Sequence, residues 1–342
     1  MQILKDVPLG LHSTMRLGGK AAYATDVYSK DDIIEALDWA NQKGLQTLMI
    51  GSGSNIIWRD EGFPGLLLVN KIKLYESYAE DEENYYISLG GGEIWDEVVA
   101  KTVAAGLSGI EALSLIPGTV GATPIQNVGA YGQEISQTLV SLEAYDTKTQ
   151  QLVIIPASDC GFAYRTSRFK TDDHNRFLII KIVLHLIRGS MQPPFYSSLQ
   201  KYFDEHNLND YSPQVVRDAV VAIRRSKLPD PAQVANNGSF FANPIINEES
   251  LTQLINDHPD LSYWPQDNGQ VKLSAAWLVE HAGFSNAHDT ETGMATWPSQ
   301  CLVLVNEHAK NTADLLNFKQ KILTAVQQKF DVSLEQEPEL LP

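Results

Sequence analysis

Three kinds of side chain in this sequence could do chemistry: an enclosed hydroxyl, isolated basic residues and carboxylates near the C-terminus. Ser239 is preceded by Asn236-Asn237-Gly238 and followed by Phe240-Phe241. The two aromatic side chains would partly dehydrate the hydroxyl and fix its direction, so that Ser239 could donate a proton at a defined point. A turn serine that bonds its own backbone also accounts for the local sequence.

The basic residues stand out because the chain is acidic. With 26 Lys and Arg against 42 Asp and Glu, its formal charge is −16, so a few local cations must capture any anionic ligand. Arg165, within FAYRTSRFK, could hold a carboxylate through two hydrogen bonds, or it could end a solvated strand. Arg224, Arg225 and Lys227 could hold a diphosphate, although a helix C-terminus, which favours cations, explains them equally well.

Glu335, Glu337 and Glu339 alternate along the C-terminal residues. On an extended chain all three would face the same side. Acidic tails are usually solvated, so the residue pattern by itself does not single out a catalytic acid here.

One glycine-rich stretch, Pro117–Gly132, contains no Asp, Glu, Lys or Arg, but has four glycines and two prolines. Solvent loops are usually charged, and helices and strands do not tolerate this much Gly and Pro. Such a segment suits a backbone that lies against a flat or phosphorylated ligand, where N–H groups bind and Cβ atoms would obstruct. An ordinary tight loop between two elements is the alternative.

A second glycine-rich run, Gly51-Ser52-Gly53-Ser54-Asn55, follows an expected strand and offers N–H donors and two hydroxyls to phosphates. It is not a dinucleotide fingerprint, because Ile56 stands where the third glycine belongs. It is not a P-loop either, because no Gly-Lys-Ser/Thr follows.

Several classes of function are disfavoured. The acidic charge argues against a nucleic-acid partner. The eight histidines lack metal-ligand spacing, Cys160 and Cys301 are far apart, and no Gly-x-Ser-x-Gly elbow occurs, so we expect neither a metal site nor a serine hydrolase. Without a signal peptide or a run of about 18 apolar residues, we expect a cytoplasmic protein with no membrane partner.

The elements that must position these residues follow from periodicity and turn signals. The expected strands span 21–28, 47–50, 56–58, 65–69, 85–89, 139–145, 151–155, 177–187 and 301–306. The expected helices span 30–43, 94–105, 212–225, 248–257, 271–283 and 312–330. The polar segment 189–211 is interpreted as a linker or lid, and the chain ends in a further strand.

A collinear set of motifs resembles the UDP-N-acetylenolpyruvoylglucosamine reductase (MurB) family over almost the entire chain. The motifs are TMRLGG (14–19), IGSGSNIIW (50–58), IPGTVGATPIQNVGAYG (116–132), FAYRTSRFK (162–170), KLPDP (227–231), NNGSFFANP (236–244), VKLSAAWLVE (271–280) and the LEQEP tail. Tyr196 matches the long-loop class of this family, in which a substrate-binding tyrosine lies at that place.

The resemblance implies an α+β fold: a two-subdomain FAD-binding domain of the PCMH or vanillyl-alcohol-oxidase type and a C-terminal α+β substrate-binding domain. We expect the FAD domain at 1–189 (subdomains about 1–70 and 71–189), a substrate-covering loop or linker at 190–211, the substrate domain at 212–330 and a strand with the catalytic Glu at 331–342. This flavin fold is not the Rossmann fold, which explains the missing third glycine.

The resemblance also implies a cytoplasmic flavoenzyme of peptidoglycan (cell wall) synthesis. NADPH would reduce a non-covalently bound FAD, which would reduce UDP-N-acetylglucosamine enolpyruvate to UDP-N-acetylmuramate. Flavin N5 would pass hydride to C3, and Ser239 would protonate C2. Arg165 would polarise the enolpyruvyl carboxylate, where charge develops. A tail Glu would assist: ungapped counting from Leu334 gives Glu337, and alignment on Glu-Pro-Glu gives Glu339; we adopt Glu337.

The binding residues follow from the same resemblance. Those expected to contact FAD are Gly51, Ser52, Gly53, Ser54, Asn55, Pro117, Gly118, Gly121, Ala122, Pro124, Gln126, Asn127, Gly129, Ala130 and Tyr131. Those expected to contact the UDP substrate are Tyr196, Lys227, Asn243, Lys272 and Gln300. We expect no metal and a monomeric protein.

Two rival hypotheses remain. One is a different flavin oxidase of the same fold, acting on a hydroxy acid or sugar; the histidine that binds flavin covalently in many such enzymes is missing from GSGSN. The other is a UDP-sugar or flavin carrier that uses the same glycines without chemistry.

Overall fold

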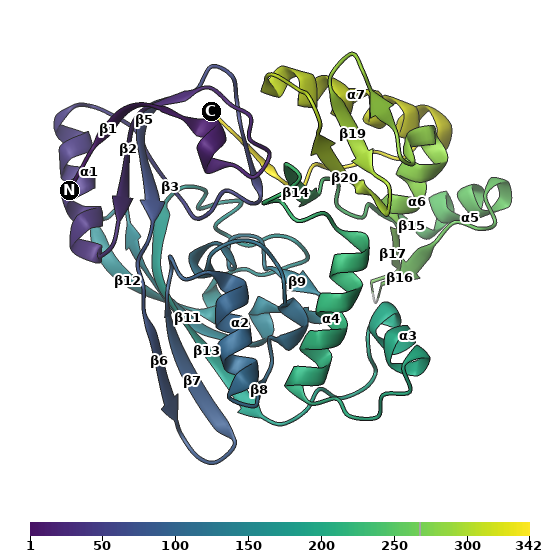
Figure 1. The fold of residues 1–342 in the computed structure, drawn as a ribbon, viewed down its shortest axis with the longest axis horizontal. Helices are drawn as coiled ribbons and strands as arrows, with labels where there is room; N and C mark the ends of the chain where they lie inside the picture. Colours follow the sequence, from purple (N-terminus) through teal and green to yellow (C-terminus); the bar gives the residue numbers. More distant parts are fainter. Residues whose placement is uncertain (267) are drawn as a thin grey trace. The chain divides into compact units, whose positions relative to one another are not determined.

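The computed structural model of the chain describes residues 1–266 and 268–342 (Figure 1). The chain forms two compact units. Unit 1 comprises Met1–Val7, Ala21–Ser52 and Phe63–Ser226, and unit 2 comprises Pro8–Lys20, Gly53–Gly62 and Lys227–Pro342. Two short N-terminal segments therefore belong to the unit that is otherwise C-terminal, a division that the order of motifs along the sequence does not reveal.

The first sheet of unit 1 has the strand order β1-β2-β5-β3, in which β5 pairs in parallel with both β2 and β3. Its strands are β1 (Leu4–Pro8), β2 (Lys20–Val27), β5 (Phe63–Asn70) and β3 (Thr47–Ile50). Helix α1 (Lys30–Gln42) begins where the Ser29 side chain accepts a hydrogen bond from the Asp32 N–H, and it packs Ile33 and Leu37 against this sheet. The crossover helix allows β2 and β3 to run in the same direction.

The second sheet of unit 1 is antiparallel, with the order β12-β11-β13-β7-β6 and β8 beside β13. The strands are β12 (Gln151–Pro156), β11 (Leu139–Asp146), β13 (Phe177–Arg188), β7 (Asn84–Gly90), β6 (Tyr75–Ala79) and β8 (Leu107–Ser108). Helix α2 (Trp95–Ala104) packs Trp95 and Val99 into the core beneath Ile182 and Leu184 of the long central strand β13.

Two further helices of unit 1, α3 (Ser197–Glu205) and α4 (Pro213–Lys227), share a small apolar core. Leu199 and Phe203 of α3 pack with Val216 and Val220 of α4. The segment 190–211, expected to be a linker or a substrate-covering loop, thus contains a helix that the sequence did not predict. The apolar residues of α3 are few, and Phe203 is four positions after Leu199, so a short amphipathic helix lies within a mostly polar sequence.

The described residues of unit 2 form two small antiparallel sheets and a parallel strand pair. The first sheet is β14 (Asn236–Ser239), β20 (Gln300–Asn306), β19 (Met294–Trp297) and β18 (His288–Asp289). The second is β15 (Ile245–Asn247), β17 (Gln270–Leu273) and β16 (Tyr263–Pro265), and the pair is β21 (Glu339–Leu341) with β4 (Ile56–Trp58). Helices α5 (Glu248–Asp257), α6 (Ala275–Val279) and α7 (Thr312–Phe330) complete the unit (Figure 1).

Two sequence expectations in unit 2 were wrong in detail. The stretch 271–283, expected to be one helix, is divided between β17 and α6, because Val271 and Leu273 alternate inward while Ser274 caps the helix that follows. The C-terminal strand covers only Glu339–Leu341 rather than all of 331–342. The long helix expected at 312–330 is confirmed as α7.

The start of α7 depends on a carboxylate from another segment of unit 2. Asp60 accepts hydrogen bonds from the Thr312 N–H (2.7 Å) and the Ala313 N–H (2.9 Å). The Thr312 hydroxyl donates to the Trp58 carbonyl at 2.6 Å. A carboxylate at this end satisfies N–H groups that have no helical partner and complements the helix dipole.

Asp60→Ala should therefore destabilise the protein by about 1–2 kcal/mol, because two helix N–H groups lose their acceptor. Urea unfolding followed by tryptophan fluorescence measures the change. Glu61→Ala, an exposed neighbouring carboxylate, is the matched control and should unfold as the wild type does. Equal unfolding midpoints for the two variants would contradict this role of Asp60.

Candidate active site

The glycine-rich segments of unit 1 touch one another through their backbones. The Gly121 N–H donates to the Gly91 carbonyl at 2.9 Å, and the Gly91 N–H donates to the Ile180 carbonyl at 2.7 Å. A Cβ at Gly121 would stand 3.1 Å from the backbone of Gly91, and a Cβ at Gly51 would collide with the Thr119 side chain. Side chains at these positions would force the segments apart, so the Pro117–Gly132 loop requires its glycines.

A buried hydroxyl in this loop lacks a hydrogen-bond partner. Thr119 is 5% exposed, and its Oγ1 has no partner among residues 1–266 and 268–342. Buried polar atoms are almost always hydrogen-bonded, so an unsatisfied one indicates a missing ligand or water. Thr119 was not among the expected flavin contacts, although it lies between two of them, Gly118 and Gly121.

Side-chain hydrogen bonds of Asn127 fix the conformation in the middle of the glycine-rich loop. Asn127 is 1% exposed and has a left-handed backbone (φ 48°). Its amide donates to Glu134 (2.7 Å) and to the Ala163 carbonyl (3.2 Å), and it accepts from the Ser136 N–H (3.1 Å). The side chain thus shapes the loop. Beyond it, Gly129–Ala130 pair as strand β9 with β10 (Gln133–Glu134).

The other expected flavin contacts lie in the same two segments. Pro124 is buried, Gln126 is partly buried, and Pro117 and Ala122 are exposed. Gly51 and Ser52 belong to unit 1, whereas Gly53, Ser54 and Asn55 belong to unit 2. There, a Cβ at Gly53 would collide with the His12 carbonyl, so this glycine also permits a close backbone contact.

Arg165 is held against the glycine-rich loop. Its Nη2 donates to the Gly129 carbonyl at 2.8 Å, and its guanidinium lies 5.1 Å from the ring centre of Tyr164. Its backbone is left-handed (φ 54°), an unusual conformation for a non-glycine residue. Such conformations persist where the surroundings impose them, often at functional sites. The predicted carboxylate-binding Arg and the predicted flavin loop are therefore neighbours in unit 1.

Tyr131 and Tyr196, predicted for different ligands, also meet in unit 1. Their rings pack edge to face with centroids 5.9 Å apart. Tyr131 has a left-handed backbone (φ 50°) at the end of the glycine-rich loop, and Tyr196 immediately precedes α3 with 46% of its surface exposed. Helix α3, unexpected from the sequence, thus sets the position of Tyr196.

The basic residues at the end of α4 differ in their exposure to solvent. Arg225 and Lys227 are exposed, whereas Arg224 has a buried Nε without a hydrogen-bond partner among the described residues. Burial lowers the pKa of the Arg224 guanidinium. The helix dipole stabilises a cation at this end by about 0.3–1 kcal/mol. Burying an ion costs several kcal/mol, so the dipole alone does not account for Arg224.

In unit 2, Ser239 ends strand β14 opposite Val303 of β20. The turn before it is fixed: Gly238 has φ 72°, and its N–H donates to the Asn236 side chain at 2.8 Å. Phe240 and Phe241 are 0% and 1% exposed. The two aromatic side chains after Ser239 are therefore core residues, and they fix the backbone from which the partly buried serine projects.

Glu337 runs beside the residues that follow Ser239. Its N–H donates to the Phe240 carbonyl at 2.9 Å, and the Ala242 N–H donates to the Glu335 carbonyl at 3.0 Å. Glu339 instead pairs with Ile56 of β4, and its N–H donates to the Asn55 carbonyl at 2.9 Å. Of the two alternative acids, Glu337 is the one hydrogen-bonded to the neighbour of Ser239.

The expected substrate-binding residues of unit 2 come from several elements. The Asn243 side chain accepts from the Ala275 N–H at 3.0 Å at the start of α6. Lys272 lies on the central strand β17, with its ammonium 5.8 Å from the Trp264 ring centre. Gln300 begins β20, and Lys227 is exposed.

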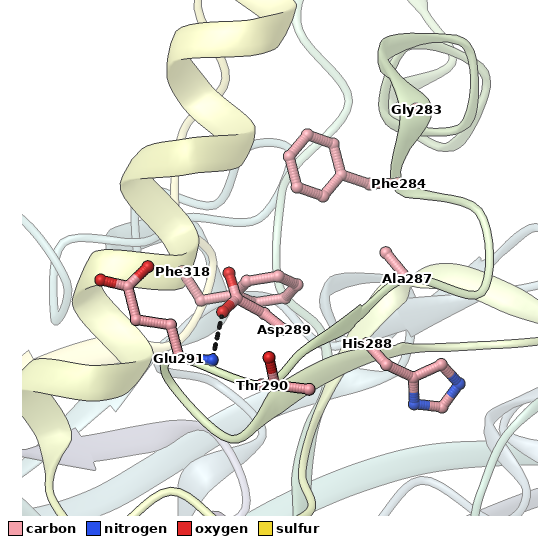
Figure 2. A pocket seen from close by; sticks show the side chains of 8 residues that line it. All are labelled: Gly283, Phe284, Ala287, His288, Asp289, Thr290, Glu291 and Phe318. Atoms are coloured by element: carbon pink, nitrogen blue, oxygen red, sulfur yellow. Dashed lines mark hydrogen bonds between the residues drawn. The ribbon is translucent and has the colours of Figure 1, made fainter.

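An open hollow elsewhere in unit 2 contains none of the predicted site residues (Figure 2). It lies among Gly283, Phe284, Ala287, His288, Asp289, Thr290, Glu291 and Phe318. Lys321 bridges two of its carboxylates, Asp289 (2.7 Å) and Glu291 (2.6 Å). No group of three or more His, Cys, Asp or Glu within the described part of the chain could hold a metal ion, and no helix there is long and apolar enough to cross a membrane.

The comparisons first define a class of protein. Residues 22–154 match the family model of an FAD binding domain, and residues 230–341 match the C-terminal domain of UDP-N-acetylenolpyruvoylglucosamine reductase. The first range contains both glycine-rich segments, and the second contains Ser239 and Glu337. The two-domain α+β organisation expected from the sequence is thereby confirmed, and the chain belongs to the FAD-binding proteins.

Similarity over the whole chain identifies the family. The chain is 38% identical to the UDP-N-acetylenolpyruvoylglucosamine reductase of Ralstonia nicotianae, over 97% of each chain, and 37% identical to that of Cupriavidus pinatubonensis, over 98% of each. The crystal structure of the same reductase (MurB) from Thermus caldophilus superimposes with a TM-score of 0.68 at 19% identity, covering 100% of this chain and 98% of that one. This chain belongs to the UDP-N-acetylenolpyruvoylglucosamine reductase family.

The residues of unit 1 fit the FAD that this family model implies. Glycines at 51, 91 and 121 leave backbone exposed without Cβ atoms, and the unsatisfied Thr119 hydroxyl lies against Gly51. Backbone N–H groups and hydroxyls of this kind bind phosphates. These features are what a pyrophosphate-bearing cofactor requires.

Gly121→Ala should weaken FAD binding, because the new Cβ presses on the Gly91 backbone at 3.1 Å. Overpacking of this size costs about 1–3 kcal/mol. Flavin retained per chain after dialysis, measured by absorbance, tests this. Gly189→Ala, with nothing within 4 Å of its Cβ, should keep the wild-type flavin content. If Gly121→Ala retains flavin as well as the control does, this role of the glycine contact is wrong.

Proposed function

We propose that this protein is the NADPH-dependent, FAD-containing reductase that converts UDP-N-acetylglucosamine enolpyruvate into UDP-N-acetylmuramate for peptidoglycan synthesis. The observation that carries the proposal is that the segment containing Glu337 is hydrogen-bonded to the residue that follows Ser239. A hydroxyl and a carboxylate lie on adjacent segments, joined by the hydrogen bond from the Glu337 N–H to the Phe240 carbonyl, in a chain of this family.

The reaction adds a hydride and a proton across the enolpyruvyl double bond. FAD, when bound, supplies the hydride from N5 to C3 after NADPH has reduced it. Negative charge then develops at C2 and spreads into the neighbouring carboxylate. Ser239 donates its hydroxyl proton to C2, which completes the lactyl ether of the product. An alcohol is a weak acid, but a carbanionic centre is basic enough to take a proton from one placed beside it.

Arg165 holds the substrate carboxylate in this proposal. A guanidinium can form two parallel hydrogen bonds to a carboxylate, and its fixed charge stabilises the negative charge that develops there. The hydrogen bond from Arg165 Nη2 to the Gly129 carbonyl supports this role, because it pre-positions the cation on the glycine-rich loop. A preorganised charge costs no rearrangement at the moment of reaction.

Glu337 assists the proton transfer. A carboxylate near the Ser239 hydroxyl can orient it and return a proton after it has reacted. The backbone contact with Phe240 supports Glu337 over Glu339, whose contact is with Asn55.

The UDP part of the substrate is bound in this proposal by Tyr196, Lys227, Asn243, Lys272 and Gln300. The lysines supply local positive charge on a chain of formal charge −16. In Asn243 the side-chain oxygen already accepts from Ala275, so its amide N–H groups are the part offered to a ligand. We also propose that the protein acts as a cytoplasmic monomer without a nucleic-acid partner.

The wild-type protein tests the activity in two anaerobic steps. NADPH should bleach the flavin absorbance, and the enolpyruvyl substrate should restore it with formation of UDP-N-acetylmuramate. A different flavin oxidase would fail the second step, because that substrate would leave the flavin bleached. A carrier would fail the first step.

Ser239→Ala should leave bleaching by NADPH intact and slow the second step by about 10²–10⁴-fold, the usual contribution of a positioned acid. Stopped-flow absorbance measures both steps on the same sample. Ser285→Ala, an exposed serine of unit 2, is the control and should behave as the wild type does. An unchanged second step in Ser239→Ala would assign the proton to another group.

Glu337→Gln should slow the second step, because the amide cannot exchange a proton with Ser239, whereas Glu339→Gln should keep the wild-type rate. The same stopped-flow measurement compares them. If Glu339→Gln is the slow variant, the alternative alignment of the tail is the correct one.

A further inference from the structure

Arg224, in the last turn of α4, is partly buried in unit 1. Its Nε is buried without a hydrogen-bond partner among the residues described, and the guanidinium lies within hydrogen-bonding reach of the Tyr131 hydroxyl. Val220, one helical turn earlier on the same face, belongs to the apolar core of α3 and α4. Arg224 is therefore a cation on the buried face of α4, unlike its exposed neighbour Arg225.

The carboxylate that attracts Arg224, Asp96, is already bound by other groups. Both terminal nitrogens of Arg217 donate hydrogen bonds to the Asp96 carboxylate, at 2.6 Å and 3.0 Å. The Leu115 N–H donates to the same carboxylate at 2.6 Å. Burial opposes the charge on Asp96, yet these hydrogen bonds outweigh it and lower the pKa of the carboxyl. Arg217 thus neutralises Asp96, and Arg224 adds a second positive charge nearby.

The Tyr131 hydroxyl adds a second hydrogen-bond donor beside the Arg224 guanidinium. A guanidinium can only donate hydrogen bonds, so the phenol oxygen accepts from Arg224 and its own proton is directed elsewhere. Burial raises the pKa of the Tyr131 hydroxyl, which keeps it protonated and able to donate. The edge-to-face contact with Tyr196 and the left-handed backbone fix the ring. The pair presents an N–H and an O–H donor with net positive charge.

We propose that Arg224 and Tyr131 form a subsite for a phosphate of a nucleotide diphosphate. The inference rests on the proposed function in one respect: nucleotides are the anions that this protein handles. The excess charge and the unpartnered Nε call for an anion, and phosphate oxygens accept from a guanidinium and a hydroxyl together. Two molecules supply such a diphosphate: FAD and the UDP part of the substrate. The experiment below distinguishes them.

The test uses the holoenzyme and two binding measurements that need no turnover: FAD retained after dialysis and UDP affinity by isothermal titration calorimetry. Arg224→Met should weaken one of them by about 10–100-fold, as expected for loss of a charged hydrogen bond. Tyr131→Phe should weaken the same one by a smaller factor. Arg225→Met is the matched control on the exposed face and should leave both unchanged.

The pattern of losses identifies the source. A loss of FAD retention alone assigns the subsite to the cofactor diphosphate, and a loss of UDP affinity alone assigns it to the exchanging nucleotide. Arg224→Lys, which keeps the charge, should restore part of the loss. The proposal is overturned if Arg224→Met changes neither measurement, or if Arg224→Lys binds no better than Arg224→Met, because the role is then structural. A wild-type protein without flavin or turnover would instead refute the proposed function.

Discussion

The close backbone contact between glycine-rich segments is the constraint on which unit 1 depends. Gly121 and Gly91 are joined by a 2.9 Å hydrogen bond, and Gly51 leaves room only for the Thr119 side chain. Because no Cβ intervenes, one uncharged loop lies against the ends of both sheets. That loop in turn supplies the carbonyl of Gly129 that holds Arg165. In the proposed function, cofactor binding and substrate activation would therefore share one piece of backbone.

The acidic net charge of the chain is a second constraint on the site. A protein of formal charge −16 that handles anionic nucleotides must concentrate its cations where the ligands bind. In the proposed site, Arg165 is attached to the glycine-rich loop and the partly buried Arg224 lies beside Tyr131. Arg217 neutralises Asp96, which would otherwise compete for the second of these cations.

Strong local patterns made much of the fold predictable. The apolar period of α7 and the strands at 47–50 and 56–58 were expected with the bounds that the structure has. Helix α3 was missed because Leu199 and Phe203 are its only fully buried side chains. The stretch 271–283 was misassigned because a buried strand and a short helix follow each other without a break, and propensity could not locate the change.

The sequence proposed the composition of the site but not its arrangement. Family motifs supplied Ser239 and Arg165, whereas the choice between Glu337 and Glu339 depended on pairing between segments distant in sequence. The sequence did indicate that Arg224 faces the core, since it follows Val220 by one helical turn. The neighbouring Arg225 nevertheless made the cluster resemble a solvent-exposed helix end. No feature of the sequence pointed to Thr119, because an unsatisfied hydroxyl can be recognised only in the packed structure.

The central claim is that the glycine-rich segments of unit 1 hold FAD. The most direct measurement is the identity and amount of flavin released by denaturing the purified wild-type protein, determined by chromatography and absorbance. The account predicts FAD, released without cleavage of a covalent bond, at about one molecule per chain, the occupancy of a single tight site. Protein that carries no flavin and takes up none from added FAD would contradict the account.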